Sequence, residues 1–301
     1  MNINLKANDQ RFLRAMGDIT SRQTKAQTQI ASGRRIQAPS DAPDEVGNLL
    51  AARADRERVS QIKSNLDRVK TEVDTGEIAL QASVRIADRA RVLGAQGVSG
   101  TQTGLTRRQI ATEVGNLLQQ LSNQANTVVN GRYIFSGDAD GTAAFLFIPG
   151  DPPTVSSYLG NSATREVLHP SGGNFPVSKA GDEIFSNGEP EKNISAALTQ
   201  LYAALTANNE EDIKAALANV SSAGEHMNDM LAYYGTVQNQ VSDASSTANA
   251  TLLNLKAQIS EIEDTDMTGA IVALNRAAYE QQAALGARSK MPTGTLFDYM
   301  R

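Results

Sequence analysis

Few side chains in this sequence have the type and spacing that catalysis or metal binding requires. The chain has two histidines, His169 and His226, and neither has a second ligand at metal-binding spacing. The run GDADG, residues 137–141, resembles the start of a calcium loop, but the sixth loop position lacks glycine and the twelfth, Pro149, lacks the closing glutamate. We therefore interpret both histidines as surface residues and the run as a turn.

Four carboxylates lie close together near the end of the chain: Glu261, Glu263, Asp264 and Asp266. A pair of such groups can perform acid–base catalysis or bind magnesium. The cluster lies at a break between helical patterns, where charged residues ordinarily cap helices in contact with water. We therefore favour solvated caps over a catalytic or metal site.

The remaining signatures of enzyme chemistry are missing from the sequence. There is no cysteine, which excludes disulfides, thiol catalysis and cysteine-based zinc sites. No phosphate-binding glycine loop, nucleophile elbow or H-E-x-x-H zinc motif occurs. The sequence predicts no catalytic residue, no cofactor and no metal.

Charge and hydropathy exclude further classes of function. The net charge is −5 over 301 residues, and basic residues are accompanied by acidic ones, as in residues 53–68, which is typical of a solvated helix face. This charge pattern argues against a nucleic-acid partner.

No run of 18 apolar residues occurs, and the start lacks a basic segment followed by an apolar one. We expect no membrane insertion and no cleaved signal peptide.

Two long stretches have the 3-4 spacing of a helix with a packing seam. One covers residues 44–98, followed by a turn at 99–104 and a further helix over 105–130. The second lies near the other end and supplies a partner for the first. The seam positions are Val59, Ile62, Leu66, Val69, Val73, Gly76 and Leu80 in the first stretch, and Ser245, Ala248, Leu252, Leu255, Ile259 and Ile262 in the second.

Each end of the chain carries a shorter seam, separated from the long one by a break. The front break is SGRRIQAPSDAPDE, residues 32–45, and the back break is IEDTDM, residues 262–267, where Thr265 or Asp266 can cap the next helix. Both breaks lie about equally far from their chain end, so the two tails are expected to run side by side as a separate layer. The tail seams are Leu5, Phe12, Met16, Ile19, Gln23, Ala26 and Ile30, and Ile271, Leu274, Ala278, Gln281 and Leu285.

The tail seams contain glutamine and much alanine, so they bury little apolar area. Such helices are marginal alone. We predict that both tails are disordered in the monomer and fold when they pack against other chains. The alternative is a monomeric antiparallel bundle with frayed ends.

The middle of the chain differs from both ends in composition and lacks their helical periodicity. Residues 131–187 hold seven of the fourteen Phe and Tyr residues, and six of the nine prolines lie between Pro149 and Pro190. The runs GRYIFSG (131–137) and AAFLFI (143–148) are bounded by glycine and proline, which predicts strands. We expect a small inserted β domain over residues 138–187, after which helix resumes near Glu191. The fold class is mainly α: a long antiparallel helical bundle or coiled-coil rod made from both chain ends, with this insert.

The two breaks also carry a family resemblance. The stretch QTQIASGRRIQAPSDAPDE resembles the N-terminal signature of the flagellin superfamily, and ISEIEDTDMTGAIVALNRAAYEQQAAL resembles its C-terminal signature. The ending LFDYM is similar to the terminal cluster of the family, although Pro292 and Gly294 stand where the family usually keeps a continuous helix. Within the superfamily, VVNGRYIFSGDADGTAAF resembles the hook–filament junction proteins more than filament flagellins.

The resemblance implies a division into three parts. Residues 1–43 with 265–301 would form an inner helical tube, 44–137 with 188–264 the long-helix domain, and 138–187 an outward-facing domain. The front break would be a spoke between helical layers, with Arg34, Arg35, Ile36 and Asp41 as its contact residues. Assembly contacts would come from Leu5, Phe12, Met16, Ile19 and Ile30 in the first tail, and from Ile271, Leu274, Ala278, Leu285, Leu296, Phe297 and Tyr299 in the second.

The function that follows is structural. The resemblance implies a subunit of the extracellular bacterial flagellum that joins hook to filament, with other copies of itself, the hook-side junction protein and flagellin as partners. It further implies export through the flagellar type III apparatus without a cleaved peptide, and a cytosolic chaperone on the C-terminal tail. The alternatives are a filament flagellin and, from another class, an intracellular coiled-coil scaffold.

Overall fold

The computed structural model describes residues 2–186 and 188–290, with side chains from residue 9 onward except that of Pro190. The chain divides into two compact units, residues 1–58 with 252–301 and residues 59–251. The helices are α1 (Asn2–Ser32), α2 (Pro43–Val98), α3 (Gly104–Ala125), α4 (Gly181–Phe185), α5 (Ile194–Ala207), α6 (Glu210–Glu263) and α7 (Met267–Ser289), with 3-10 turns η1 (Pro39–Asp41) and η2 (Pro190–Lys192).

The strands are short and form three separate antiparallel pairs. β1 (Val128–Val129) pairs with β2 (Arg132–Tyr133), β3 (Phe147–Ile148) with β4 (Thr154–Val155), and β5 (Glu166–Leu168) with β6 (Asn174–Pro176). In the register, Val128 lies opposite Tyr133, Phe147 opposite Val155, and Val167 opposite Phe175. The mainly helical fold with small strand pairs confirms the predicted fold class.

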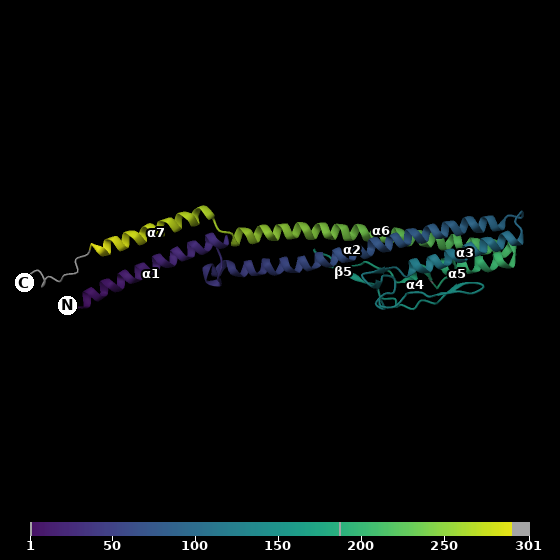
Figure 1. Cartoon of the computed structure of the whole chain (residues 1–301), viewed down its shortest axis with the longest axis horizontal. Helices are drawn as coiled ribbons and strands as arrows, with labels where there is room; N and C mark the ends of the chain where they lie inside the picture. The colour runs from purple at the N-terminus through teal and green to yellow at the C-terminus, as the bar shows by residue number, and fades with distance from the viewer. Residues whose placement is uncertain (1, 187, 291–301) are drawn as a thin grey trace, which may run out of the picture. The chain divides into compact units, whose positions relative to one another are not determined.

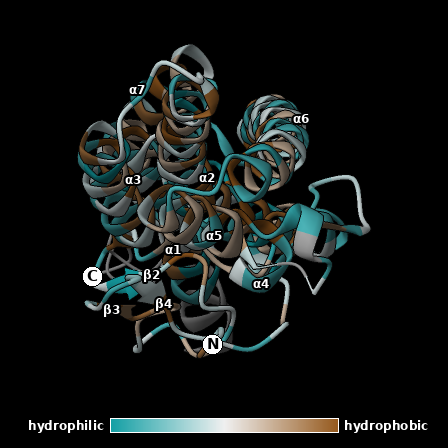
Figure 2. Cartoon of the chain, turned by 90° about the vertical axis from the view of Figure 1, so that its right-hand side faces the viewer, coloured by the Kyte–Doolittle hydropathy of each residue, from teal (hydrophilic) through white to brown (hydrophobic). Residues whose placement is uncertain are grey.

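The first seam is buried where the heptad pattern places it. Leu66 and Leu80 are fully buried, and Val59, Ile62 and Val73 are nearly so. In unit 59–251 this face of α2 packs with residues of α3, α5 and α6, and hydrophobic and hydrophilic residues alternate around the helices (Figure 2). Burial of one face per helix is what stabilises helices of this length.

Glycine in the seam has a specific partner. Gly76 faces the ring of Tyr234 in α6, and a Cβ at position 76 would lie 2.8 Å from Tyr234 Cε1. The absence of a side chain therefore makes room for a buried aromatic ring in a narrow helix–helix contact. The hydroxyl-bearing ring is 3% exposed.

Helix α3 ends earlier than predicted. It begins after Thr103, whose hydroxyl accepts a hydrogen bond from the Thr106 backbone N–H, and it ends at Ala125 instead of continuing to residue 130. Asn130 and Gly131 both have positive φ, 53° and 79°. Two consecutive residues of this kind form the tight turn of a β-hairpin, so the turn between β1 and β2 overrides the helical pattern of the preceding residues.

The segment between α3 and α5 has little sheet. Only two residues of each predicted strand run are in strands, because the aromatic residues of these runs pack into the core. Phe135 and Phe145 are buried and both make edge-to-face contacts with Phe185, at centroid distances of 5.4 and 6.1 Å. Helix resumes at Ile194, close to the predicted position, and Asn193 caps it by accepting from the Ala196 N–H.

The two chain ends pair in the other unit. Figure 1 shows α1 (purple) and α7 (yellow) running next to each other, which confirms that the two tails lie side by side. Small residues dominate their contact: Ile19, Ala26, Ala270 and Ala277 are buried. Ion pairs flank it, Arg22 to Glu280 at 2.8 Å and Arg288 to Asp9 at 2.5 Å. A contact with so few large apolar side chains contributes little stability per residue.

Candidate functional site

The part of the front break that lies between α1 and α2, residues 33–42, folds against the back break. Gly33 has φ of +70° and its N–H donates to the Gln29 carbonyl, which ends α1 in the left-handed conformation that glycine adopts most easily. The Arg35 N–H then donates to the Glu263 carbonyl at 2.6 Å, and the Thr265 N–H to the Gly33 carbonyl at 3.0 Å. The two breaks therefore share a short antiparallel bridge, between Arg34 and Asp264.

Glu263, the acidic last residue of α6, lies at the centre of this site. Its side chain is 7% exposed, and Arg34 Nε lies 2.7 Å from Oε1 while Arg53 Nη2 lies 2.6 Å from Oε2. The Arg53 contact is a hydrogen bond. The Arg34 contact is an ion pair without hydrogen-bond geometry, so Oε1 has no hydrogen-bond donor among the residues that the structure describes.

The burial of Glu263 corrects the prediction that the acidic cluster consists of solvated caps. The other three carboxylates are exposed as predicted, and Asp266 also caps α7, since its side chain accepts from the Thr268 N–H at 3.0 Å. Arg53 is a second exception: residues 53–68 were expected to form a solvated helix face, but Arg53 pairs with the buried Glu263. Position 263 follows the seam residue Ile259 by one helical turn, and a charged residue on a seam face signals a buried partner. That signal was available in the sequence.

The second arginine of the front break contacts both helices next to it, α6 and α2. Arg35 Nη2 donates to the Ile262 carbonyl at 2.7 Å and also contacts the Glu45 carboxylate. Ile36, the next residue, is buried against Leu49, Ala52 and Ile259. The break is thus fixed by one apolar contact and two arginines.

Asp41 organises the second half of the break. Its carboxylate accepts from the Gln37 and Ala38 N–H groups at 3.0 and 2.9 Å, and Lys25 lies 3.3 Å away. These backbone hydrogen bonds, followed by Lys25, lower the pKa of Asp41 below its ordinary value of 3.8. All four predicted spoke residues therefore have defined intramolecular contacts, and their role between subunits stays a prediction.

The predicted tail residues separate into two groups. Phe12, Met16, Ile30, Leu274 and Ala278 are half-buried and Ile19 is buried, whereas Ile271 and Leu285 are 46% and 51% exposed. Leu5 lies in α1, but its side chain is outside the described residues, as are Leu296, Phe297, Tyr299 and the chain beyond Pro292. The face of α7 that packs on α1 is centred on Ala270 and Ala277, which the sequence pattern did not single out.

Exposed apolar residues remain on α7: Met267, Ile271, Val272, Tyr279 and Leu285. We call this set the α7 stripe. At 100° per residue it covers about 140° of the helix circumference. Tyr279 is the most exposed at 74%. Exposed apolar residues gathered on one side of a helix often mark an interaction surface, although Thr268, Asn275 and Gln282 lie among them.

A groove lies beside α1 in the same unit. It has a volume of about 770 Å³ and runs from Met16 and Gly17 to the break, where Arg35 and Asp41 line its end. Half of the residues in its wall along α1 are serine or threonine. The α7 stripe and this groove are candidate docking surfaces among the described residues of the terminal unit.

The described part of the chain was expected to contain two surface histidines and no metal site. Across residues 2–186 and 188–290 there is no group of three or more acidic or histidine side chains close enough to hold a metal ion. His226 contacts the Glu183 carbonyl at 2.8 Å, and His169 Nδ1 accepts from the Ser171 N–H. Within the same residues, no helix has the length and hydropathy to cross a membrane.

Known proteins resemble this chain over most of its length. It is 26% identical to flagellar hook-associated protein 3 of Escherichia coli strain K12, across 89% of this chain and 90% of that protein. It is 23% identical to the flagellar filament 30.7 kDa core protein of Treponema maltophilum, across 81% and 79%. The solved structure of the flagellar junction protein FlgL from Legionella pneumophila has the same fold, with a TM-score of 0.56, 15% identity and coverage of 72% and 98%.

Two family models match the two ends. The model of the bacterial flagellin N-terminal helical region matches residues 3–140, and that of the C-terminal helical region matches residues 217–299. Together these ranges cover well over half of the chain and include both breaks and both terminal helices. The chain therefore belongs to the bacterial flagellin family.

Proposed function

We propose that this protein is a structural, non-enzymatic subunit of the bacterial flagellum that forms the junction between hook and filament. The observation that carries the proposal is the match to a hook-associated protein 3 over nine-tenths of both chains. The structure of a flagellar junction protein with the same fold supports it. Its partners would be the hook-side junction protein, flagellin and other copies of this chain.

The terminal unit is the proposed assembly surface. The α7 stripe and the groove along α1 share no residue, so the stripe of one copy can dock on the groove of another copy. Such heterologous contacts close into a ring or continue as a helix, according to the rotation per step. Gln23 and Gln281 are half-buried polar residues at seam positions of the two tails, which favours ordering of the tails upon assembly.

The three-part division stays part of the proposal. Residues 1–43 with 265–301 would line the channel, residues 44–137 with 188–264 would form the next layer, and residues 138–187 would face outward. Export through the flagellar type III apparatus and a cytosolic chaperone on residues 271–300 are supported by the family membership and by the exposed apolar residues of α7.

Immunogold electron microscopy of whole cells tests the location. The antibody is raised against residues 138–187, and a strain lacking the gene serves as the control. We expect one band of label where hook meets filament. Label along the whole filament would instead make the protein a filament subunit, and cells without external label would contradict both flagellar assignments.

A filament subunit is the second candidate, because a filament core protein matches the chain over 81% of its length. Copy number separates the two functions. A junction ring needs few copies per flagellum, whereas a filament subunit dominates sheared filaments. Quantitative mass spectrometry of purified hook–filament preparations therefore distinguishes them.

A further inference from the structure

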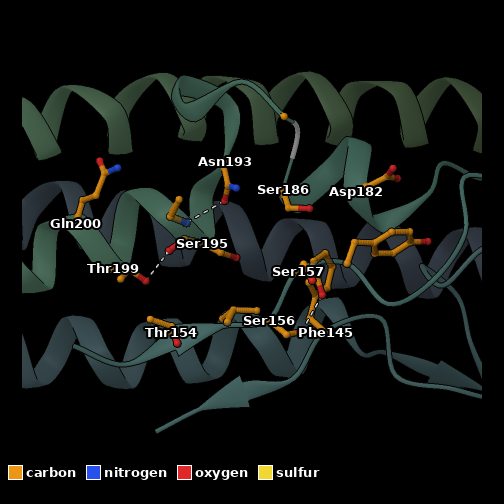
Figure 3. Close-up of a pocket in the computed structure, with 14 residues that line it drawn as sticks. Phe145, Thr154, Ser156, Ser157, Asp182, Ser186, Asn193, Ser195, Thr199 and Gln200 are labelled. Carbon is orange, nitrogen blue, oxygen red and sulfur yellow. Dashed lines mark hydrogen bonds between the residues drawn. The ribbon is translucent and has the colours of Figure 1, made fainter. Parts of the chain in front are cut away.

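A polar groove lies in unit 59–251. It has a volume of about 730 Å³, which is in the range of small-molecule sites. One wall is the segment from β4 to Tyr158, and the other is the first two turns of α5 (Figure 3). The α5 wall extends from Asn193 to Gln200, roughly 10 Å at 1.5 Å per residue, so the groove suits an extended ligand.

We propose that this groove binds a neutral carbohydrate. The first argument is charge. None of its lining residues is lysine, arginine or histidine, and the single ionisable carboxylate is Asp182. An anion would meet no cation and one negative charge, so phosphates, nucleic acids and acidic sugars are disfavoured. The lining is instead rich in hydroxyl and amide groups, which suit a neutral ligand with many hydroxyls.

The second argument is that several of these groups remain available. Asn193 accepts from the Ala196 N–H through Oδ1, which leaves the N–H groups of its side-chain amide available to a ligand. Within the described residues, the hydroxyls of Thr154, Ser157 and Ser195 have no protein partner. The groove therefore offers donors and acceptors on both walls (Figure 3).

The third argument is an aromatic end. Tyr158 lines the groove near Asp182, and its ring packs at a centroid distance of 5.5 Å on the ring of Phe145, which is buried and supports it from the core. The Tyr158 hydroxyl lies 2.9 Å from the carbonyl oxygens of Phe135 and Asn161, so it is engaged inward and the ring remains for an apolar contact. Carbohydrates present C–H faces that pack on such rings.

The walls are fixed without a ligand. The Thr199 hydroxyl bonds to the Ser195 and Pro153 carbonyls, and the Leu146 N–H donates to Ser156 Oγ. Gly181 lets Tyr158 and Phe145 pack closely, because a Cβ there would lie 3.1 and 3.2 Å from their rings. A preformed groove loses little entropy on binding, which favours affinity for a flexible sugar. The proposal is independent of the flagellar assignment.

A glycan array with the full-length chain tests the proposal, using printed neutral, sialylated and sulfated oligosaccharides. Calorimetry follows with the best neutral oligosaccharide. Thr154→Val removes a hydroxyl at constant shape, and Ser195→Trp fills the groove, while Ser242→Trp on the exposed face of α6 is the matched control. Circular dichroism checks that each variant is folded.

We expect neutral glycans to bind, with affinity about tenfold lower for Thr154→Val. Binding should be lost for Ser195→Trp and unchanged for Ser242→Trp. If Ser195→Trp does not fold, Thr154→Val alone decides. Three outcomes would overturn the proposal: no neutral glycan is retained, only acidic glycans are retained, or Thr154→Val binds as the unmodified chain does.

Discussion

At the residue scale, Glu263 concentrates the interactions of the two chain breaks. It lies one turn after a seam residue, so the helix directs it inward, and two arginines from separate segments compensate its charge. The backbone of the same residue accepts the Arg35 N–H. One side chain therefore connects the end of α6, the front break and the first turns of α2.

Glu263→Gln should loosen this site, because it leaves two arginines beside a neutral amide. Loss of a buried ion-pair partner costs about 3–5 kcal/mol, and here the partly exposed arginines reduce the expected loss to about 1–2 kcal/mol. Hydrogen exchange at the Arg35 and Thr265 amides measures it. Glu261→Gln, an exposed neighbour, is the control, and equal exchange in both variants would contradict the role of Glu263.

Asp41 makes the front break sensitive to acid. Its folded-state pKa is below the ordinary value, so its contribution to stability is complete above about pH 4 and is lost as the pH falls through the lowered pKa. We expect faster hydrogen exchange at Gln37 and Ala38 only at such acidic pH, measured by NMR. Asp41→Asn should remove this dependence; a variant that keeps the same acid transition would refute the assignment to Asp41.

At the element scale, the packing seam of α2 accommodates one residue that departs from the heptad pattern. Gly76 occupies a heptad position where a larger apolar residue is ordinary, and Tyr234 of α6 fills the space. Gly47 lies in the same helix, and a Cβ added there would meet nothing within 4 Å, which makes the two glycines a matched pair.

Alanine substitution should have opposite effects at these positions. Gly76→Ala places a methyl against Tyr234 and should destabilise the chain by about 1–3 kcal/mol. Gly47→Ala adds helix propensity in open space and should stabilise it by up to about 1 kcal/mol. Chemical denaturation measures both, and a stabilising Gly76→Ala would show that the Tyr234 ring has room to move.

The α7 stripe permits a test of assembly at the same scale. Tyr279→Asp places a charge at the most exposed apolar position of α7 and should abolish swimming in a complementation assay, while helicity stays unchanged. Ala273→Asp adds the same charge at an exposed position outside the stripe. If both variants swim normally, the stripe is not part of the interface.

At the scale of the whole molecule, the two compact units have different sources of stability. Unit 59–251 contains the large apolar cluster, whereas the terminal unit has a small one of Ile36, Leu49, Ala52 and Ile259. Marginal terminal helices suit a protein whose ends are completed by neighbouring copies.

Removal of residues 271–301 separates folding from assembly. The cut removes most of the stripe and one buried alanine of α7, Ala277, and leaves unit 59–251 intact. We therefore expect an unchanged thermal transition of that unit and no restoration of swimming. Swimming by the truncated protein would be incompatible with assembly through the C-terminal tail.

The sequence by itself determined the features that depend on local pattern. Heptad spacing placed the buried face of α2, glycine and proline placed the front break, and the capping residue Asp266 marked the back break. These features depend on helix periodicity and on backbone preferences within a few residues, so no knowledge of distant contacts was needed.

Only the tertiary structure decided what depends on partners distant in sequence. It buried Glu263 between two arginines and turned Ala270 and Ala277, not Ile271 and Leu285, toward α1. It also assembled a polar groove from β4 and α5, which are separated by some forty residues. Burial, pairing and the choice between two faces of a weakly amphipathic helix are set by long-range packing, which a single-chain pattern does not encode.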